Sequence, residues 1–166
     1  MEQLNGTTAA AGTATQEAFV EQFAAGWAGG ADGFLDHFLP DLVDEEVLLA
    51  QPLLPPARGH AGFRRLFEPL FAAIPDLRGE VLGWHPELDG VTIELALRGT
   101  LDGLPLAFVT HDRIVLRDGR ILERHAQMDP RPLLLAALRR PRTGLPFLTA
   151  PLIRWATGAL AGVVRR

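Results

Sequence analysis

The chain has 166 residues, of which 48% are hydrophobic and 22% are charged, a balance typical of one globular domain with a single core. It contains no cysteine, which excludes disulfides, thiolate nucleophiles and zinc sites built on sulfur ligands. The net charge is −4, but seven arginines and no acid follow Asp129, so an acidic body precedes a basic C-terminal segment.

The N-terminal third predicts helices. Residues 1–15 are rich in Ala, Thr and Gly and predict a disordered tail that is not a signal peptide. From Gln16 to Trp27 the apolar residues recur at helical spacing, namely Phe19, Val20, Phe23 and Trp27. A second, shorter helix is expected from Asp32 to Phe38, with Asp32 as its N-cap and Pro40 closing it.

The middle of the chain predicts a short strand, a loop and a third helix. The strand covers 46–49, and the prolines of Pro52-Leu53-Leu54-Pro55-Pro56 then predict a rigid loop, because proline lacks a backbone donor. The helix is expected over 60–73, where an apolar stripe recurs at helical spacing: Phe63, Leu66, Phe67, Leu70 and Phe71.

From Gly79 the hydrophobic period changes to two, which predicts strands over 81–85, 91–100, 105–116 and 120–129. Asp-Gly pairs at 89–90, 102–103 and 118–119 separate them, as in tight hairpin turns. Helices followed by a four-stranded antiparallel meander define an α+β fold, in which the helices cover one face of the sheet.

Residues 132–166 predict a basic amphipathic helical extension. Its apolar residues are Leu133 to Leu138 and, further on, Leu152, Trp155, Ala156, Ala159 and Val163. Two interpretations stay open: weak peripheral contact with a membrane surface, or a lid or dimer contact, which the helix-weakening Gly158 and Gly162 favour. No apolar run reaches the roughly 18 residues that a membrane span needs, so we expect a cytoplasmic protein.

The order helix, helix, Pro-rich segment, helix and meander resembles the SnoaL-like branch of the NTF2-like superfamily. Three motifs carry the resemblance, which spans roughly Phe19 to Leu138: Gln51 to Gly59, Arg117-Asp118-Gly119-Arg120-Ile121, and Gln127-Met128-Asp129-Pro130. The resemblance implies an NTF2-like cone over residues 16–131, in which N-terminal helices pack inside a curved sheet of four to six strands. It also implies an apolar pocket for a small hydrophobic molecule, a homodimer, and no cofactor.

The family's functions include polyketide cyclisation, steroid isomerisation, epoxide hydrolysis and binding without catalysis, so the fold does not settle the function. Where limonene-epoxide-hydrolase-like members carry their water-activating residues, this chain has Leu49, Gln51, Ile93, Leu95 and Ala126. Only the amide of Gln51 is retained, and the usual apparatus for epoxide hydrolysis is absent.

The last hairpin predicts which side chains face inward. A three-residue loop at Arg117-Asp118-Gly119 would place Phe108 opposite Met128, Thr110 opposite Ala126 and Asp112 opposite Arg124, all on the mostly apolar face. His111 would then face His125, and Arg113 would face Glu123, on the polar side. A two-residue loop would instead place Asp112 opposite His125 and create an Asp–His dyad.

Asp112 and Arg124 are the candidate catalytic residues. Arg124 would keep the carboxylate ionised in its apolar surroundings, where a poorly hydrated Asp112 is a good general base, although the two could also form a buried pair without chemistry. Gln51 would orient a carbonyl or a water. The full set expected to bind substrate is Gln51, Trp27, Trp84, Ile93, Leu95, Phe108, Thr110, Ala126 and Met128.

Other kinds of site are disfavoured. A two-histidine metal site at His111 and His125 is opposed by the cations Arg113 and Arg124, so we expect no metal. Nucleic-acid binding lacks a basic, aromatic strand face. The sequence therefore predicts a cofactor-independent cyclase or isomerase for a small polyketide- or terpenoid-like metabolite. The alternatives are a non-catalytic binding protein and an epoxide hydrolase with an altered site.

Overall fold

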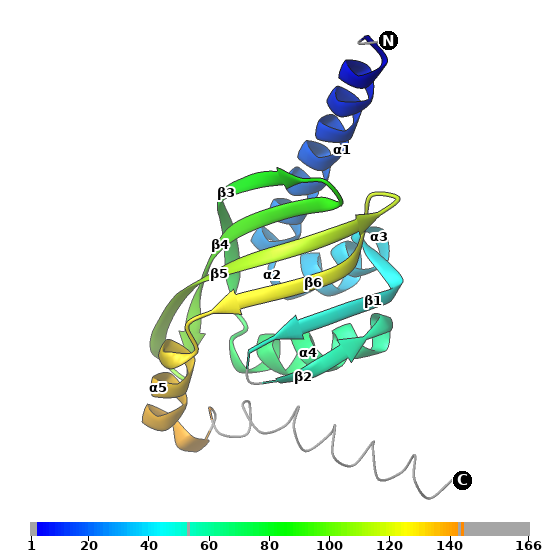
Figure 1. The fold of residues 1–166 in the computed structure, drawn as a ribbon. Helices are drawn as coiled ribbons and strands as arrows, with labels where there is room; N and C mark the ends of the chain where they lie inside the picture. Colours follow the sequence, from blue (N-terminus) through cyan, green and yellow to red (C-terminus); the bar gives the residue numbers. More distant parts are fainter. Residues whose placement is uncertain (1–2, 53, 143, 145–166) are drawn as a thin grey trace, which may run out of the picture.

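Six strands form one curved, open sheet, and the helices of the N-terminal half pack against its concave face (Figure 1). The structure is a computed structural model that describes residues 3–52, 54–142 and 144, with side chains from residue 14 onward. The strand order is β2-β1-β6-β5-β4-β3, in which β1 runs parallel to β6 and all other neighbours are antiparallel. This arrangement confirms the predicted α+β cone.

Most helices and strands occur in the predicted order, but several of them begin or end at other residues than predicted. The strands are β1 (Val43–Gln51), β2 (Leu54–Arg58), β3 (Arg78–Glu87), β4 (Gly90–Leu101), β5 (Leu104–Arg117) and β6 (Arg120–Met128). The helices are α1 (Gln3–Ala28), α2 (Gly30–Asp32), the π-helix η1 (Gly33–Phe38), α3 (Leu39–Leu42), α4 (Gly59–Ala73) and α5 (Arg131–Arg139). Among the described helices, none is long and apolar enough to cross a membrane.

Helix α1 begins at Gln3, so the backbone of residues 3–15 is helical where we expected a loose tail. The segment is rich in alanine and free of proline, and alanine has the highest intrinsic helix propensity. At the other end of the chain, α5 lies where Leu133 to Leu138 predicted a helix. The second apolar stretch of the extension, from Leu152 to Val163, lies outside the described residues.

Pro40 does not close the second helix, contrary to the prediction. The backbone continues through the π-helix η1 into α3, with Pro40 in the first turn of α3, where a missing N–H is tolerated. In the π geometry the N–H of Leu39 reaches the carbonyl of Phe34, five residues earlier. In the same pattern, the carbonyl of Leu35 would accept from residue 40, but proline has no N–H to donate. Arg64 Nη2 donates a hydrogen bond of 3.1 Å to this carbonyl instead.

The Pro-rich segment also differs from the prediction, because Leu54–Arg58 forms strand β2 rather than an irregular loop. It pairs with β1 through Leu48 with Arg58, Leu49 with Ala57 and Gln51 with Leu54. Strand β2 is the outermost strand of the sheet. An edge strand needs donors on one side only, and prolines at 55 and 56 are compatible with that position.

The last hairpin follows one of the two predicted registers near its turn and a third, unpredicted register beyond it. Its turn is the two-residue one, with Asp118 and Gly119 at φ of 54° and 77° and Arg117 paired with Arg120. A β-bulge at Leu122 then shifts the pairing, so that Asp112 lies opposite Ala126, Thr110 opposite Met128 and Ile114 opposite Arg124. Beyond the bulge, each residue of β5 therefore pairs with a residue of β6 two positions later than the three-residue loop predicted. Because side chains alternate with a period of two, every side chain beyond the bulge stays on the predicted face.

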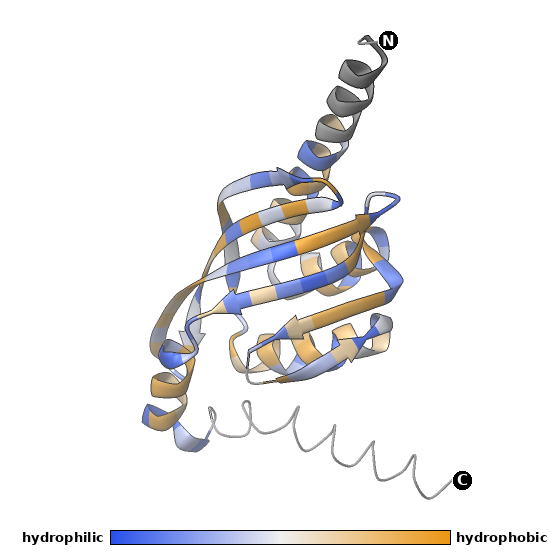
Figure 2. Cartoon of the chain, in the orientation of Figure 1, coloured by the Kyte–Doolittle hydropathy of each residue, from blue (hydrophilic) through white to orange (hydrophobic). Residues whose placement is uncertain are grey.

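Aromatic side chains from α1, η1 and α4 fill the space inside the cone. Their ring centroids lie 4.3 to 6.5 Å apart, in a cluster formed by Phe23, Trp27, Phe34, Phe38, Phe63, Phe67 and Phe71. The inward residues of β4, among them Ile93, Leu95 and Leu97, belong to the same buried core. Figure 2 shows the resulting alternation of hydrophobic and hydrophilic residues along the central strands.

Candidate functional site

The structure places an acid and a guanidinium together inside this aromatic core. The Nε and Nη2 atoms of Arg124 donate hydrogen bonds of 2.8 and 2.6 Å to the same carboxylate oxygen, Oδ2 of Asp112. Asp112 is 0% exposed and Arg124 is 6% exposed. The inward-facing pair is therefore confirmed, although the two residues meet diagonally across the hairpin rather than directly opposite each other.

The guanidinium is also held by rings. The Cζ atom of Arg124 lies 6.0 Å from the ring centroid of Trp27 in α1 and 5.6 Å from that of Phe67 in α4. Both contacts lie within the range of a cation–π interaction. Rings from two helices, α1 and α4, thus hold the cation that keeps the carboxylate in place.

The predicted substrate-binding residues form adjoining rows on the concave face. One row crosses four strands through Trp84, Ile93, Asp112 and Ala126, and the next through Val81, Leu95, Thr110 and Met128. Phe108 lies in a third row, opposite Leu97. Gln51 is half-buried at the end of β1, two residues after Leu49, which is paired with Arg124. Strand pairing thus brings together residues from four segments of the chain.

Three buried polar atoms in the described part of the chain have no hydrogen-bond partner: Trp27 Nε1, Thr110 Oγ1 and Asp112 Oδ1. Native proteins satisfy the large majority of such atoms, because an unpaired one costs about 1–3 kcal/mol. All three belong to residues that the sequence singled out. These atoms are therefore available for hydrogen bonds to a ligand.

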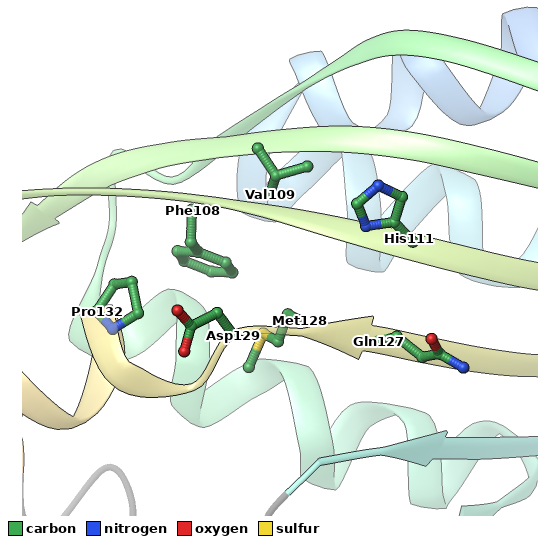
Figure 3. A pocket seen from close by; sticks show the side chains of 7 residues that line it. All are labelled: Phe108, Val109, His111, Gln127, Met128, Asp129 and Pro132. Atoms are coloured by element: carbon green, nitrogen blue, oxygen red, sulfur yellow. The ribbon is translucent and has the colours of Figure 1, made fainter.

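A hollow of about 430 Å³ opens at the end of these rows, between β5, the end of β6 and the start of α5. Its lining residues are Phe108, Val109, His111, Gln127, Met128, Asp129 and Pro132. In Figure 3, Phe108 points from β5 toward Met128 and Pro132, whereas Val109 and His111 point to the other side. Its volume is within the range of small-molecule pockets.

Phe108 and Met128 were predicted to bind substrate, whereas the other five lining residues were not. The last pair between β5 and β6 joins Thr110 to Met128, so β5 continues past the end of its neighbour. The sequence carried a signal for this unpaired end of β5. Apolar residues alternate on β5 well before residue 110, whereas Pro130 ends the partner strand shortly after Met128.

Comparison with known proteins identifies the family. The profile of the SnoaL-like domain matches residues 17–124, a segment that includes both members of the buried pair. The chain belongs to the SnoaL-like family. No curated protein matches the chain.

Solved structures share the SnoaL-like fold at low sequence identity. A proposed SnoaL-like polyketide cyclase from Jannaschia sp. CCS1 is 19% identical with a TM-score of 0.64, over 74% of this chain and 91% of that one. IdmH, a proposed polyketide cyclase from Streptomyces antibioticus, is 20% identical with a TM-score of 0.59, over 71% and 96%. PrhC from Penicillium brasilianum is 14% identical with a TM-score of 0.70, over 82% and 97%.

The outer face of this SnoaL-like sheet carries the polar residues. His111 lies opposite Gln127 and Arg113 opposite His125, so the predicted pairing of the two histidines is wrong. Each histidine instead lies beside an acid, with His111 Nε2 3.7 Å from Glu94 Oε1 and His125 Nε2 3.2 Å from Glu123 Oε2. Within the described residues, no three His, Asp or Glu side chains form a group that could hold a metal ion.

An ion pair lies at the rim of the hollow. Arg131 donates hydrogen bonds from its backbone N–H and its Nε to Asp129, at 2.8 to 3.0 Å. These bonds hold the pKa of Asp129 below its ordinary value, the side-chain bond being the larger cause. Asp129 is therefore ionised at neutral pH, in an ion pair with Arg131.

Proposed function

We propose that this SnoaL-like protein is a cofactor-independent enzyme that transfers a proton within a small hydrophobic metabolite of polyketide or terpenoid type, in a cyclisation or an isomerisation. The observation that carries the proposal is the state of Asp112. One carboxylate oxygen is fixed by Arg124, while the other, Oδ1, is buried without a partner. A fixed, poorly hydrated carboxylate with one free oxygen is suited to act as a general base.

In the proposed reaction, Asp112 Oδ1 takes a proton from a carbon next to a carbonyl group of the substrate. The electron pair of that C–H bond moves into a C–C double bond, and the carbonyl oxygen becomes an enolate oxygen. In an isomerisation, the enolate takes the proton back from Asp112 at another carbon. In a cyclisation, the enolate carbon attacks a second carbonyl carbon of the same molecule, the π bond of that carbonyl opens to an alkoxide, and the alkoxide takes the proton from Asp112. Arg124 keeps the carboxyl group oriented throughout, because two of its N–H groups donate to Asp112 Oδ2.

The surroundings of the pair favour an apolar substrate. Trp27 and Phe67 flank the guanidinium, and Ile93 and Ala126 flank Asp112 across the sheet. Epoxide hydrolysis is less well supported, since Leu49, Ile93 and Leu95 are buried apolar residues at places where a water would need polar partners. The names of the Jannaschia and Streptomyces antibioticus proteins agree with the cyclase proposal.

Proton abstraction can be tested without knowing the final product. Enolisable ketones such as 2-tetralone are incubated with the protein in D₂O, and exchange of the protons next to the carbonyl is followed by NMR. We expect the wild type to accelerate exchange and Asp112→Asn to lose about 10²- to 10⁴-fold of that acceleration. The control is Asp118→Asn at the exposed hairpin turn, where asparagine tolerates the positive φ.

Equal exchange rates in the wild type and Asp112→Asn would show that Asp112 is not the base. Binding of ketones without any acceleration would favour the alternative, a non-catalytic binding protein that uses the same pocket. Homodimerisation and a cytoplasmic location stay predictions of the sequence.

A further inference from the structure

We propose that Trp27 Nε1–H and the Thr110 hydroxyl hold the carbonyl oxygen of the substrate whose proton Asp112 removes. The inference rests on the proposed function and deepens it. It names the substrate class as a neutral ketone in which the acidic C–H is next to the bound oxygen. It also assigns two residues that act on the substrate oxygen, neither of which is charged.

The first observation is that these three polar atoms are both buried and unpartnered. Trp27 is 1% exposed, Thr110 is 3% exposed and Asp112 is 0% exposed, and each leaves one side-chain polar atom without a hydrogen bond. The three residues come from two elements, α1 and β5, that are far apart in the sequence. A local feature of one strand or one helix therefore does not account for all of them.

The second observation is that the three residues lie on the same side of the same part of the sheet. Thr110 precedes Asp112 by two residues on β5, so their side chains share the concave face. Trp27 contacts the cation that is bonded to Asp112, with its ring centroid 6.0 Å from Arg124 Cζ.

Trp27 also lies over the row that contains Thr110. A β-carbon built on Gly79 would lie 2.8 Å from Trp27 Cβ and 3.1 Å from a methyl group of Leu95. Leu95 is in turn the strand partner of Thr110. Gly79 itself pairs with Leu97, in the row of Phe108, so the side chain of Trp27 begins beside Gly79 and Leu95, and its ring reaches the guanidinium that is bonded to Asp112.

The chemistry of the three atoms is complementary to an enolisable ketone. An indole N–H can only donate a hydrogen bond, a hydroxyl can donate or accept, and a carboxylate oxygen can only accept. A ketone oxygen accepts from the two donors, while the adjacent C–H offers its proton to Asp112 Oδ1. Donors aimed at an oxygen that becomes an enolate bind it more strongly as its charge develops, which is how such groups accelerate proton abstraction.

The hollow adjoins the neighbours of Thr110, although Trp27, Thr110 and Asp112 do not line it. Met128, which lines it, is the strand partner of Thr110, and Phe108 precedes Thr110 by two residues on the same face. Under the proposal, a ligand enters between Phe108 and Met128 and reaches Thr110 before Asp112, which lies two residues further along β5.

The indole proton of Trp27 gives a direct readout. In ¹⁵N-labelled protein assigned with Trp27→Phe, we expect 2-tetralone to move the Trp27 Nε1–H resonance downfield, as a new hydrogen bond does. Tetralin, which has the same ring system without the oxygen, should leave that resonance close to its position in the free protein. A Trp27 resonance that responds alike to both compounds at saturation would overturn the inference, as would a set of ketones that bind no better than their parent hydrocarbons.

Affinity measurements test the two donors separately. Thr110→Val keeps the shape of the side chain and removes its hydroxyl, whereas Thr110→Ser keeps the hydroxyl. We expect Thr110→Val and Trp27→Phe each to weaken binding of 2-tetralone by about 2- to 10-fold, the equivalent of one net hydrogen bond. Thr110→Ser should retain most of the affinity, and none of the three should change binding of tetralin by a comparable factor.

The two proposals fail in different ways. If exchange of ketone protons depends on Asp112 but neither donor variant changes affinity or kcat/KM, the proposed function stands and the assignment of Trp27 and Thr110 is wrong. If the donor variants weaken ketone binding and no exchange depends on Asp112, the two residues bind the oxygen as inferred and the proton transfer is wrong.

Discussion

At the scale of single residues, the buried pair of Asp112 and Arg124 dominates. Removing two charges from water is costly, and their mutual attraction offsets that cost only when both partners are present. The pair contributes little net stability compared with apolar residues of the same volume. The proposed chemistry gives a reason for its presence inside an otherwise apolar core.

This energetic asymmetry gives a measurable prediction. Arg124→Met leaves the Asp112 carboxylate buried without its partner, and we expect it to lower the free energy of unfolding by about 3–5 kcal/mol. The double variant Asp112→Leu with Arg124→Met removes both charges and should recover most of that loss. Urea unfolding at pH 7 measures both. A double variant as unstable as Arg124→Met would contradict this account of the pair.

At the scale of elements, the contact between α1 and β3 decides where Trp27 lies. Gly79 is buried on β3 and faces the side chain of Trp27, with no room for a larger residue. Gly83, four residues later on the same strand, has nothing within 4 Å of the position that a β-carbon would occupy. The two glycines therefore form a matched pair, of which only one positions the indole.

We expect Gly79→Ala to lower the free energy of unfolding by about 1–3 kcal/mol, the usual cost of overpacking a core. It should also shift the Trp27 indole resonance, because the new methyl group displaces the ring. Gly83→Ala should leave both close to the wild type. Thermal unfolding and the ¹⁵N spectrum check the pair, and equal effects of the two substitutions would show that the close approach at Gly79 is not what holds Trp27.

At the scale of the whole molecule, carboxylates outside the core tie distant elements together. Asp44 on β1 accepts bonds of 2.6 and 3.0 Å from Arg117 at the last hairpin turn. Asp76, after α4, accepts bonds of 2.7 and 2.8 Å from the hydroxyl and N–H of Thr100 on β4. These bonds hold the pKa of each carboxyl below its ordinary value, with Arg117 and Thr100 as the respective largest causes.

Acid should therefore destabilise the fold at these links. A carboxyl with a lowered pKa in the folded state stabilises the protein above its unfolded pKa of about 3.9, and the contribution is lost as the pH falls through the lower folded value. We expect the urea midpoint to fall between pH 5 and pH 2.5. Asp44→Asn should show a smaller fall over that interval than the wild type. A fall of the same size in both would exclude Asp44 as a contributor.

The sequence by itself determined the type of nearly every element and the direction of the key side chains. Periods of 3.6 and 2 are local properties of the chain, so the helices over 16–27 and 60–73, the meander and α5 could all be predicted from them. Alternation along β5 and β6 likewise sent Asp112 and Arg124 inward. The error of two residues in the register left this result unchanged, because side chains alternate with a period of exactly two.

Only the tertiary structure decided features that depend on what lies next to a segment. Leu54–Arg58 is a strand because an edge position tolerates prolines, and Pro40 is tolerated because Arg64 satisfies the carbonyl of Leu35. The bulge at Leu122, the parallel pairing of β1 with β6 and the hollow beyond Met128 likewise have no local periodic signal. Local alternation therefore determined which side chains face the core, whereas contacts between distant segments determined which of them meet.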